Sequence, residues 1–261
     1  MSGHSKWSSI KHKKGAADAK RGKLFSKLSR AIIVAAKEGG PDPAGNLALQ
    51  NAIEKARSYS MPKDNIDRAV AKGSGADADA STFETVVYEG YGPNGVALIV
   101  EALTDNRNRT AADVRAAFSK YDGNLGGSGA VAWLFERRAV ILVDAERADE
   151  DELTLAAAEG GADDVEQDGS SYRVTGAPEA LSRVREAIEQ AGIEVDSAEL
   201  TMVPKTTISL EDEGSAKKTL RLIDALEESD DVQEVYANFD IPEQVMEAVA
   251  SCRDHRGVRR G

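Results

Sequence analysis

The apolar positions in the first third of the chain repeat with the 3.6-residue period of an α-helix. A helix is predicted from residue 16 to residue 39, where two glycines and a proline end it. Its apolar stripe consists of Leu24, Leu28, Ile32 and Ala35, and its cationic stripe consists of Lys20, Lys23, Lys27, Arg30 and Lys37. Such a helix can pack inward along one stripe and present cations outward along the other.

Two shorter helices are predicted to follow, over residues 44–59 and 62–72. Pro62 stands at the first position of the second one, where its missing N–H costs nothing. Residues 1–75 are therefore predicted to form a basic helical domain of three helices. The Gly, Ser, Ala and Asp composition of residues 73–81 indicates a linker.

Strand-like patterns replace the helical period after the linker. Strands are predicted at 85–88 and 96–103, joined by a glycine-rich hairpin turn. A helix at 106–120 and a strand at 131–135 follow, so this first sheet is incomplete. Residues 139–203 then show the order strand, helix, strand, strand, helix, strand, which is the ferredoxin-like split pattern.

The incomplete sheet can be finished by later segments. A strand at 206–210, a helix at 215–227 and a strand at 232–237 follow the ferredoxin-like unit. The predicted fold class is therefore α+β, with an N-terminal three-helix domain and two ferredoxin-like α+β domains, the third inserted into the second. The predicted domains are 1–75, 82–137 with 204–241, the inserted 138–203, and a C-terminal tail 242–261. A plain tandem of three units is the alternative.

Charge divides the chain into two parts of opposite sign. Residues 1–75 hold fifteen Lys and Arg against six Asp and Glu, a net of +9, and the remaining eighteen against thirty-nine give −21. A cationic segment on an acidic body is best explained by an anionic partner, and a polyphosphate backbone carries the required charge. A solvated lysine-rich tail or an organelle-targeting segment would also be basic, but Trp7 and two histidines among the cations favour contact with bases.

The candidate nucleic-acid-binding residues follow from this division of charge. They are His4, Lys6, Trp7, Lys11, His12, Lys13, Lys14, Lys20, Arg21, Lys23, Lys27, Arg30, Arg107 and Arg109. The last two open a predicted helix in an otherwise acidic region. There they serve either as a second phosphate contact or as ordinary surface arginines beside a helix cap.

Catalysis has little support in the composition. The only cysteine is Cys252, and the histidines are His4, His12 and His255, so no catalytic residue, metal site or cofactor is predicted. The glycine-rich stretch 123–129 precedes a predicted strand rather than a helix, which favours a flexible connection over a nucleotide site. The acidic runs 149–152 and 227–231 are interpreted as solvated faces.

No small-molecule substrate is predicted, and no membrane association, since the longest apolar run, 31–36, is too short to cross a bilayer. The predicted location is cytoplasmic, because no secretory signal is visible.

Several ordered blocks of sequence resemble the YebC/PmpR family, which includes the mitochondrial translational activator of cytochrome c oxidase. The blocks are GHSKW at 3–7, IKHKK at 10–14, AADAKRGKLFSKL at 16–28, YEGYGPNG at 88–95, DNRNRT at 105–110, GNLG at 123–126 and DDVQEVYANFD at 230–240. The resemblance implies a helical domain followed by two α+β domains, the third inserted into the second. It also implies a regulator that is not an enzyme.

Members of that family are described either as DNA-binding transcriptional regulators or as ribosome-associated translation factors. The sequence predicts a non-enzymatic nucleic-acid-binding regulator of gene expression, with a ribosome- or RNA-associated translation factor favoured. An irregular cationic arm can thread into RNA crevices and become ordered on binding. A DNA-binding transcriptional regulator is the alternative. The expected partner is rRNA or the ribosome, or else DNA, and the acidic domains are left as a surface for a protein partner.

Overall fold

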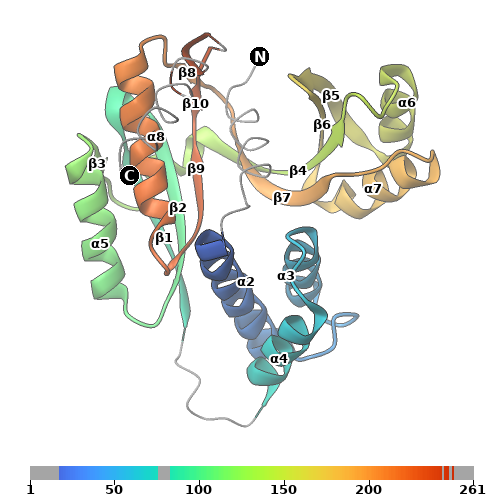
Figure 1. The fold of residues 1–261 in the computed structure, drawn as a ribbon, viewed down its shortest axis with the longest axis horizontal. Helices are drawn as coiled ribbons and strands as arrows, with labels where there is room; N and C mark the ends of the chain where they lie inside the picture. Colours follow the sequence, from blue (N-terminus) through green and yellow to red (C-terminus); the bar gives the residue numbers. More distant parts are fainter. Residues whose placement is uncertain (1–17, 76–82, 243, 247–248, 250–261) are drawn as a thin grey trace, which may run out of the picture.

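The computed structural model describes residues 18–75, 83–242, 244–246 and 249, which form a mixed α+β protein (Figure 1). The three N-terminal helices are confirmed: α2 spans Asp18–Gly39, α3 spans Leu47–Ser58 and α4 spans Lys63–Ser74. Their shared core contains Leu28, Ile32, Leu49, Ile53 and Ile66, so the predicted apolar stripe of α2 does face inward.

One buried side chain fixes the turn between α2 and α3. Asn46 is the N-cap of α3, and its Oδ1 accepts a hydrogen bond of 3.1 Å from the backbone N–H of Leu49. Its Nδ2 donates to the carbonyl oxygens of Ala35 at 2.7 Å and Gly40 at 2.9 Å. The same amide therefore satisfies the start of one helix and the end of the other.

The next unit is a four-stranded antiparallel sheet with two helices on one face, called the middle unit below. Its strands are β1 (Glu84–Tyr91), β2 (Ala97–Thr104), β3 (Asn124–Leu125) and β9 (Val232–Ala237), in the order β3-β1-β2-β9. The two helices are α5 (Arg107–Lys120) and α8 (Glu213–Glu227). Val114, Phe118, Leu220 and Leu222 pack from these helices against Leu98 and its neighbours in the sheet. The first two strands form a hairpin, with the short turn η1 (Pro93–Gly95) between them.

A second four-stranded sheet lies between β3 and β9 in the sequence. Its elements are β4 (Phe135–Asp144), α6 (Glu150–Gly160), β5 (Ala162–Asp168), β6 (Ser171–Gly176), η3 (Pro178–Ala180), α7 (Leu181–Gln190) and β7 (Ser197–Pro204). The strand order is β5-β6-β4-β7, all antiparallel, which is the arrangement expected of a ferredoxin-like unit. After this insertion the chain returns to the middle sheet, where β9 pairs with β2.

One strand prediction is wrong, and another predicted strand lies in a different sheet from the one expected. Residues 132–134 form the short turn η2 (Ala132–Leu134), and the strand begins only at Phe135 and belongs to the inserted sheet. The carboxylate of Glu89 accepts the N–H groups of Val131 and Ala132 at 2.8 Å, so those donors are not free for a strand ladder. The predicted strand at 206–210 is β8 (Ile208–Ser209), which pairs with β10 (Phe239–Asp240) in a separate parallel pair.

Glu89 also gives the glycine-rich stretch a defined structure. Glu89 is 6% exposed, and its side chain accepts a third backbone N–H, from Gly129 at 2.7 Å. Burial alone would raise the pKa of Glu89, but the three amide donors outweigh burial and hold that pKa below its usual value. The stretch 123–129 is therefore tied to a buried anion rather than being the flexible connection predicted.

The core of the middle unit extends beyond its predicted end at residue 241. Met246 and Val249 are 6% and 4% exposed and pack with Phe239 and Ile241. Among the described residues, no helix is long and apolar enough to cross a bilayer.

Candidate nucleic-acid interface

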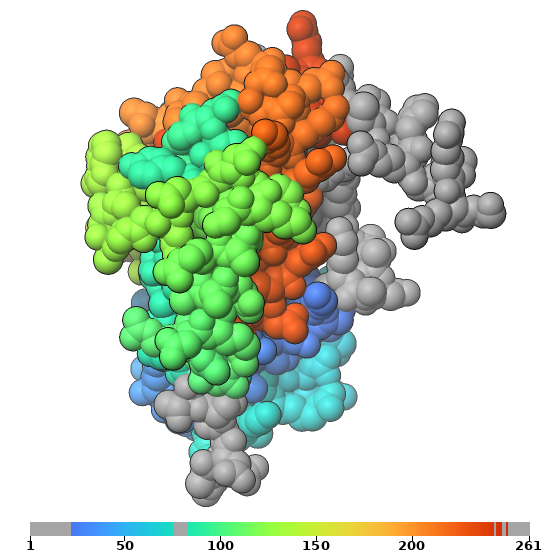
Figure 2. Space-filling view, turned by 90° about the vertical axis from the view of Figure 1, so that its left-hand side faces the viewer, coloured from blue at the N-terminus to red at the C-terminus, as the bar shows by residue number. Residues whose placement is uncertain are grey.

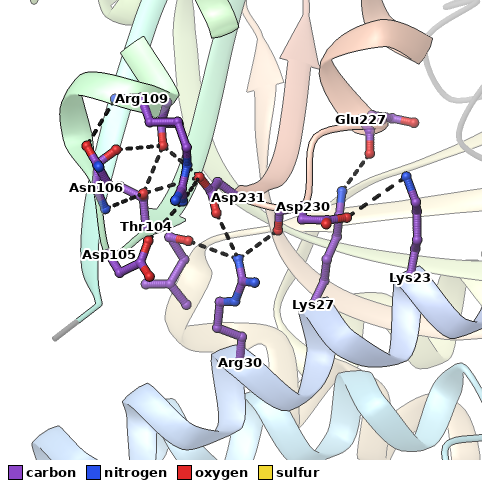
Figure 3. A network of polar contacts seen from close by, with 12 residues as sticks. Lys23, Lys27, Arg30, Thr104, Asp105, Asn106, Arg109, Glu227, Asp230 and Asp231 are labelled. Carbon is purple, nitrogen blue, oxygen red and sulfur yellow. Dashed lines mark hydrogen bonds and ion pairs between the residues drawn. The ribbon is translucent and has the colours of Figure 1, made fainter. Parts of the chain in front are cut away.

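Three cations of the α2 stripe, Lys23, Lys27 and Arg30, contact the middle unit, whereas Lys37 is exposed. Lys27 Nζ donates a 2.6 Å hydrogen bond to the carbonyl oxygen of Glu227, and Lys23 Nζ donates one of 3.3 Å to that of Glu228. Arg30 reaches the carbonyl oxygen of Asp230 at 2.8 Å and the carboxylate of Asp231 at 3.1 Å (Figure 3). The prediction that these cations project outward is therefore corrected for Lys27 and Arg30, whereas the side chain of Lys23 is 57% exposed.

The end of helix α8 explains why the cations lie there. The last carbonyl groups of a helix lack internal partners, and the helix dipole makes this end negative. Here the helix ends in Glu227 and Glu228, followed by Asp230 and Asp231. Segment 227–231, called the acidic loop below, therefore concentrates backbone and side-chain negative charge in one place. The three cations of α2 supply the compensating charge from another part of the chain.

Asp231 is the most buried anion of the acidic loop. Its side chain is 9% exposed, and its Oδ2 accepts hydrogen bonds from Thr104 at 3.2 Å, Thr110 at 2.7 Å and Arg109 at 2.7 Å. Burial alone would raise the pKa of Asp231, but the bonds from Arg109 and the two threonines outweigh it and hold that pKa below its usual value. Asp231 is therefore a buried carboxylate with a full set of donors. The solvated-face interpretation of its segment is wrong for Asp231, whereas Glu228 and Asp230 are exposed.

The two candidate arginines of α5 have different surroundings. Arg109 pairs with Asp105 at 2.8 Å as well as with Asp231, while Arg107 lies 3.8 Å from Glu84 and its side chain is 65% exposed. Asn106 is the N-cap of the helix, accepting from the N–H of Arg109. The interpretation of this motif as a helix cap therefore holds for Asn106, which is the cap, and for Arg109, which is paired with neighbouring carboxylates. Arg107 is the more accessible of the two arginines.

A cleft of about 610 Å³ opens beside these contacts. Its walls include Arg30, Phe83, Arg109, Asp113, Asp230 and Asp231. The guanidinium carbon of Arg30 lies 4.9 Å from the centre of the Phe83 ring, a cation–π distance. In Figure 2 the orange and red segment of α8 and β9 lies directly against the blue of α2, with green α5 beside it.

A second polar contact joins the helical domain to the inserted sheet. Lys55 on α3 pairs with Glu234 of β9 and lies 3.9 Å from Glu199 of β7. Burial alone would lower the pKa of Lys55, but the two carboxylates outweigh it and raise that pKa. Glu54 of α3 lies 3.3 Å from Arg185 of α7. The helical domain therefore contacts both other units through ion pairs.

Most of the predicted arm falls outside the described residues. This holds for His4, Lys6, Trp7, Lys11, His12, Lys13 and Lys14, and for the side chains of Lys20 and Arg21. Of the candidates, the structure brings together Lys23, Lys27, Arg30 and Arg109 around the acidic loop, and Arg107 stands apart.

Sequence reasoning missed Asp231 and Lys55 as the residues that organise the contacts of the helical domain. One signal for Asp231 was present. An acidic run at the C-terminal end of a predicted helix opposes the dipole of that helix and so requires a cation from elsewhere. Lys55 offered no signal, because its carboxylate partners lie at positions 199 and 234, far away in sequence.

The fold and its contacts define a class of protein with a basic three-helix domain docked by ion pairs on two α+β units, one inserted into the other. Comparisons with known proteins place the chain more closely. A family model described as the TACO1/YebC protein N-terminal domain matches residues 5–76, and one described as the TACO1/YebC second and third domain matches residues 83–239. The chain belongs to the TACO1/YebC family.

Individual relatives match over nearly the whole chain. A protein of Rubrobacter xylanophilus is 60% identical over 96% of this chain and 100% of its own length, and one of Natranaerobius thermophilus is 52% identical over 95% and 99%. Both are named "Probable transcriptional regulatory protein". The crystal structure of a conserved hypothetical protein from Aquifex aeolicus superposes with a TM-score of 0.80, at 50% identity over 90% of this chain and 96% of that one.

Proposed function

We propose that this protein is a non-enzymatic, nucleic-acid-binding regulator of gene expression that acts as a ribosome- or RNA-associated translation factor. The observation that carries the proposal is the division of charge, +9 over residues 1–75 and −21 over the rest. A chain of this kind attracts a polyanion to one end and repels it from the other. The names of the relatives support the regulatory role.

The contacts of α2 divide the candidate residues into two groups. Lys23, Lys27 and Arg30 already have acceptors within the protein. The proposal therefore gives the first encounter with nucleic acid to the cations of the arm, which are Lys6, Lys11, Lys13, Lys14, Lys20 and Arg21. Trp7 among them supplies a ring that can stack on an unpaired base.

Paired charge substitutions test this assignment. The double variant Lys13→Gln with Lys14→Gln should reduce co-sedimentation with ribosomes at low salt. It should also lower the slope of log affinity against log salt by about 1.4 to 1.8, the loss expected for two phosphate contacts. Lys63→Gln with Lys72→Gln on α4 is the matched control, because it removes the same charge from the same domain. Equal effects of the two pairs, or no effect of the first, would remove the arm from the interface.

Trp7→Ala separates stacking from charge. Loss of one stacked base should weaken binding by about 1–3 kcal/mol and leave the salt slope nearly unchanged. Measurement of affinity at several salt concentrations distinguishes this result from the lysine variants. A Trp7→Ala protein with unchanged affinity would mean that the ring does not contact a base.

A DNA-binding transcriptional regulator is the second candidate, and the names of the relatives favour it. In that case α4 would be the element that reads bases, through Lys63, Asn65 and Lys72. Footprinting on genomic fragments decides between the two. If one DNA site is protected more than about a thousandfold over bulk DNA, and the α4 double variant loses this protection, the protein is a DNA-binding regulator rather than an RNA-associated one.

A further inference from the structure

The contact between α2 and the middle unit is formed by polar groups. Lys23, Lys27 and Arg30 provide its donors, and the end of α8 with the acidic loop provides most of its acceptors. Among the described residues, no cluster of buried hydrophobic residues joins α2 to α8 or β9, and the buried apolar residues of α2 belong to the core of the helical domain. Interfaces of this polar kind between domains open and close more readily than apolar ones.

The acceptors of this contact have the chemistry of a phosphodiester backbone. All of them are oxygen atoms, from carbonyl groups and carboxylates, and except for the carbonyl oxygen of Leu103 in β2 they lie at the negative end of α8 or in the acidic loop. The three cations lie at positions i, i+4 and i+7 of α2, so they cover about 10 Å of the helix axis. One strand of a duplex carries about three phosphates over that length.

The middle unit keeps its own structure when α2 leaves. Asp231 would lose the bond from Arg30 but retain Thr104, Thr110 and Arg109, so no buried carboxylate is left without donors. The side chains of Lys23 and Asp230 are already 57% and 70% exposed, so water reaches this pair before the contact opens. Opening the contact at the end of α8 therefore leaves few buried polar groups of the acidic loop unsatisfied. The pairs of Lys55 on α3 with Glu234 and Glu199 are a separate contact, which has to serve as the hinge or exchange its partners for water.

We propose that this face of α2 is a phosphodiester-binding surface and that the acidic loop occupies it as an internal competitor. The proposal rests on the nucleic-acid binding proposed above and adds how that binding is regulated. The arm makes the first contact, phosphates then displace the acidic loop from Lys23, Lys27 and Arg30, and the helical domain separates from the end of α8. The fraction of molecules in the open state limits the apparent affinity.

A charge-matched pair of variants tests the exchange. Glu227→Gln, Glu228→Gln and Asp230→Asn together remove the side-chain charges of the acidic loop and leave its backbone carbonyl acceptors in place. Asp231 is left intact because it holds the middle unit together. Glu150→Gln, Asp151→Asn and Glu152→Gln, at the start of α6, change the net charge by the same amount far from α2. Fluorescence anisotropy with a single-stranded RNA oligonucleotide and with a DNA duplex reads the affinity. The loop variant should bind about three- to tenfold more tightly than the α6 variant.

A distance measurement reports the opening itself. Dyes on Ala44→Cys in the helical domain and Ser119→Cys on α5, in a Cys252→Ser background, should change their energy transfer as the RNA or DNA saturates the protein. Equal affinities of the two charge variants, or constant energy transfer at saturation, would overturn the exchange and leave the proposed function standing. If the unsubstituted protein binds neither probe, the proposed function fails, and the exchange fails with it.

Discussion

The two acidic runs of this chain have nearly the same composition and opposite positions on their helices. Residues 149–152 precede and begin α6, where the helix dipole favours negative charge, and Asp149 caps the helix by accepting the N–H groups of Asp151 and Glu152. Residues 227–231 end α8, where the dipole disfavours negative charge. The first run is stabilised by its own helix, whereas the second is compensated by cations from α2 and α5.

The difference shows that charge composition alone does not tell whether an acidic segment is a solvated face or a docking site. The end of the helix at which it lies decides whether it needs a partner. Substitutions in the two acidic runs and in the contacts of α2, together with a change of pH, should therefore have effects of very different size.

Asp231→Ala should have the largest effect on stability. It leaves Arg109 and the buried hydroxyls of Thr104 and Thr110 without their shared acceptor. We expect the free energy of unfolding, measured by urea denaturation, to fall by about 2–3 kcal/mol, because the buried threonine hydroxyls lose their acceptor while Arg109 keeps Asp105. Asp231→Asn keeps an oxygen acceptor and should lose less. A loss below about 1 kcal/mol for the alanine variant would show that the network contributes little.

Lowering the pH should remove the contribution of the Asp231 carboxylate to the free energy of unfolding without any substitution. The pKa of Asp231 is below its ordinary value of about 3.9 in the folded protein, because the bonds from Arg109 and the threonines outweigh burial. A lowered folded pKa adds stability that is complete above the ordinary pKa and is lost as the pH falls through the folded one. The stability difference between the unsubstituted protein and Asp231→Asn should therefore stay constant from pH 7 to pH 5 and shrink below pH 4. Parallel curves at all pH values would contradict this.

The same distinction between local and distant partners explains what the sequence could predict. The apolar stripe of α2 follows from neighbours three and four residues apart, and Leu28 and Ile32 are indeed buried. The order of elements also predicted the return of the chain to the middle sheet through β9. The run from Val131 to Phe135 looked like a strand, but it turns because the carboxylate of Glu89, 42 residues earlier than Val131, takes its amide groups.

What the cationic stripe of α2 contacts also depends on residues that are far away in the sequence. Periodicity places Lys23, Lys27 and Arg30 on one side of α2, but it does not say what that side faces. The answer depends on the acidic loop, 200 residues away from Lys27 and Arg30. The pattern of residues within one helix cannot predict a contact with a segment so far away in the sequence.

Asp149→Ala should have an intermediate effect, confined to the start of α6. It removes a capping carboxylate that accepts two backbone N–H groups at 3.0 and 3.1 Å. The expected loss is about 1 kcal/mol of unfolding free energy, and Asp149→Ser should recover most of it because a serine also caps helices. Docking of α2 should be unaffected, since α6 lies in the inserted unit. A change in energy transfer between the helical domain and α5 would argue against this separation.

Lys23→Ala should have the smallest effect. Its partners are the carbonyl oxygen of Glu228 and, at 4.0 Å, the exposed carboxylate of Asp230, so water and salt screen the interaction. We expect a loss below about 0.5 kcal/mol at low salt. The loss should vanish at 1 M salt, where screening acts within about 3 Å.

Lys37→Ala, in the last turn of the same helix, is the control for helix propensity and overall charge. If Lys23→Ala and Lys37→Ala show the same salt dependence, the contact of Lys23 with the end of α8 adds nothing measurable to docking, and Lys27 and Arg30 hold α2 in place.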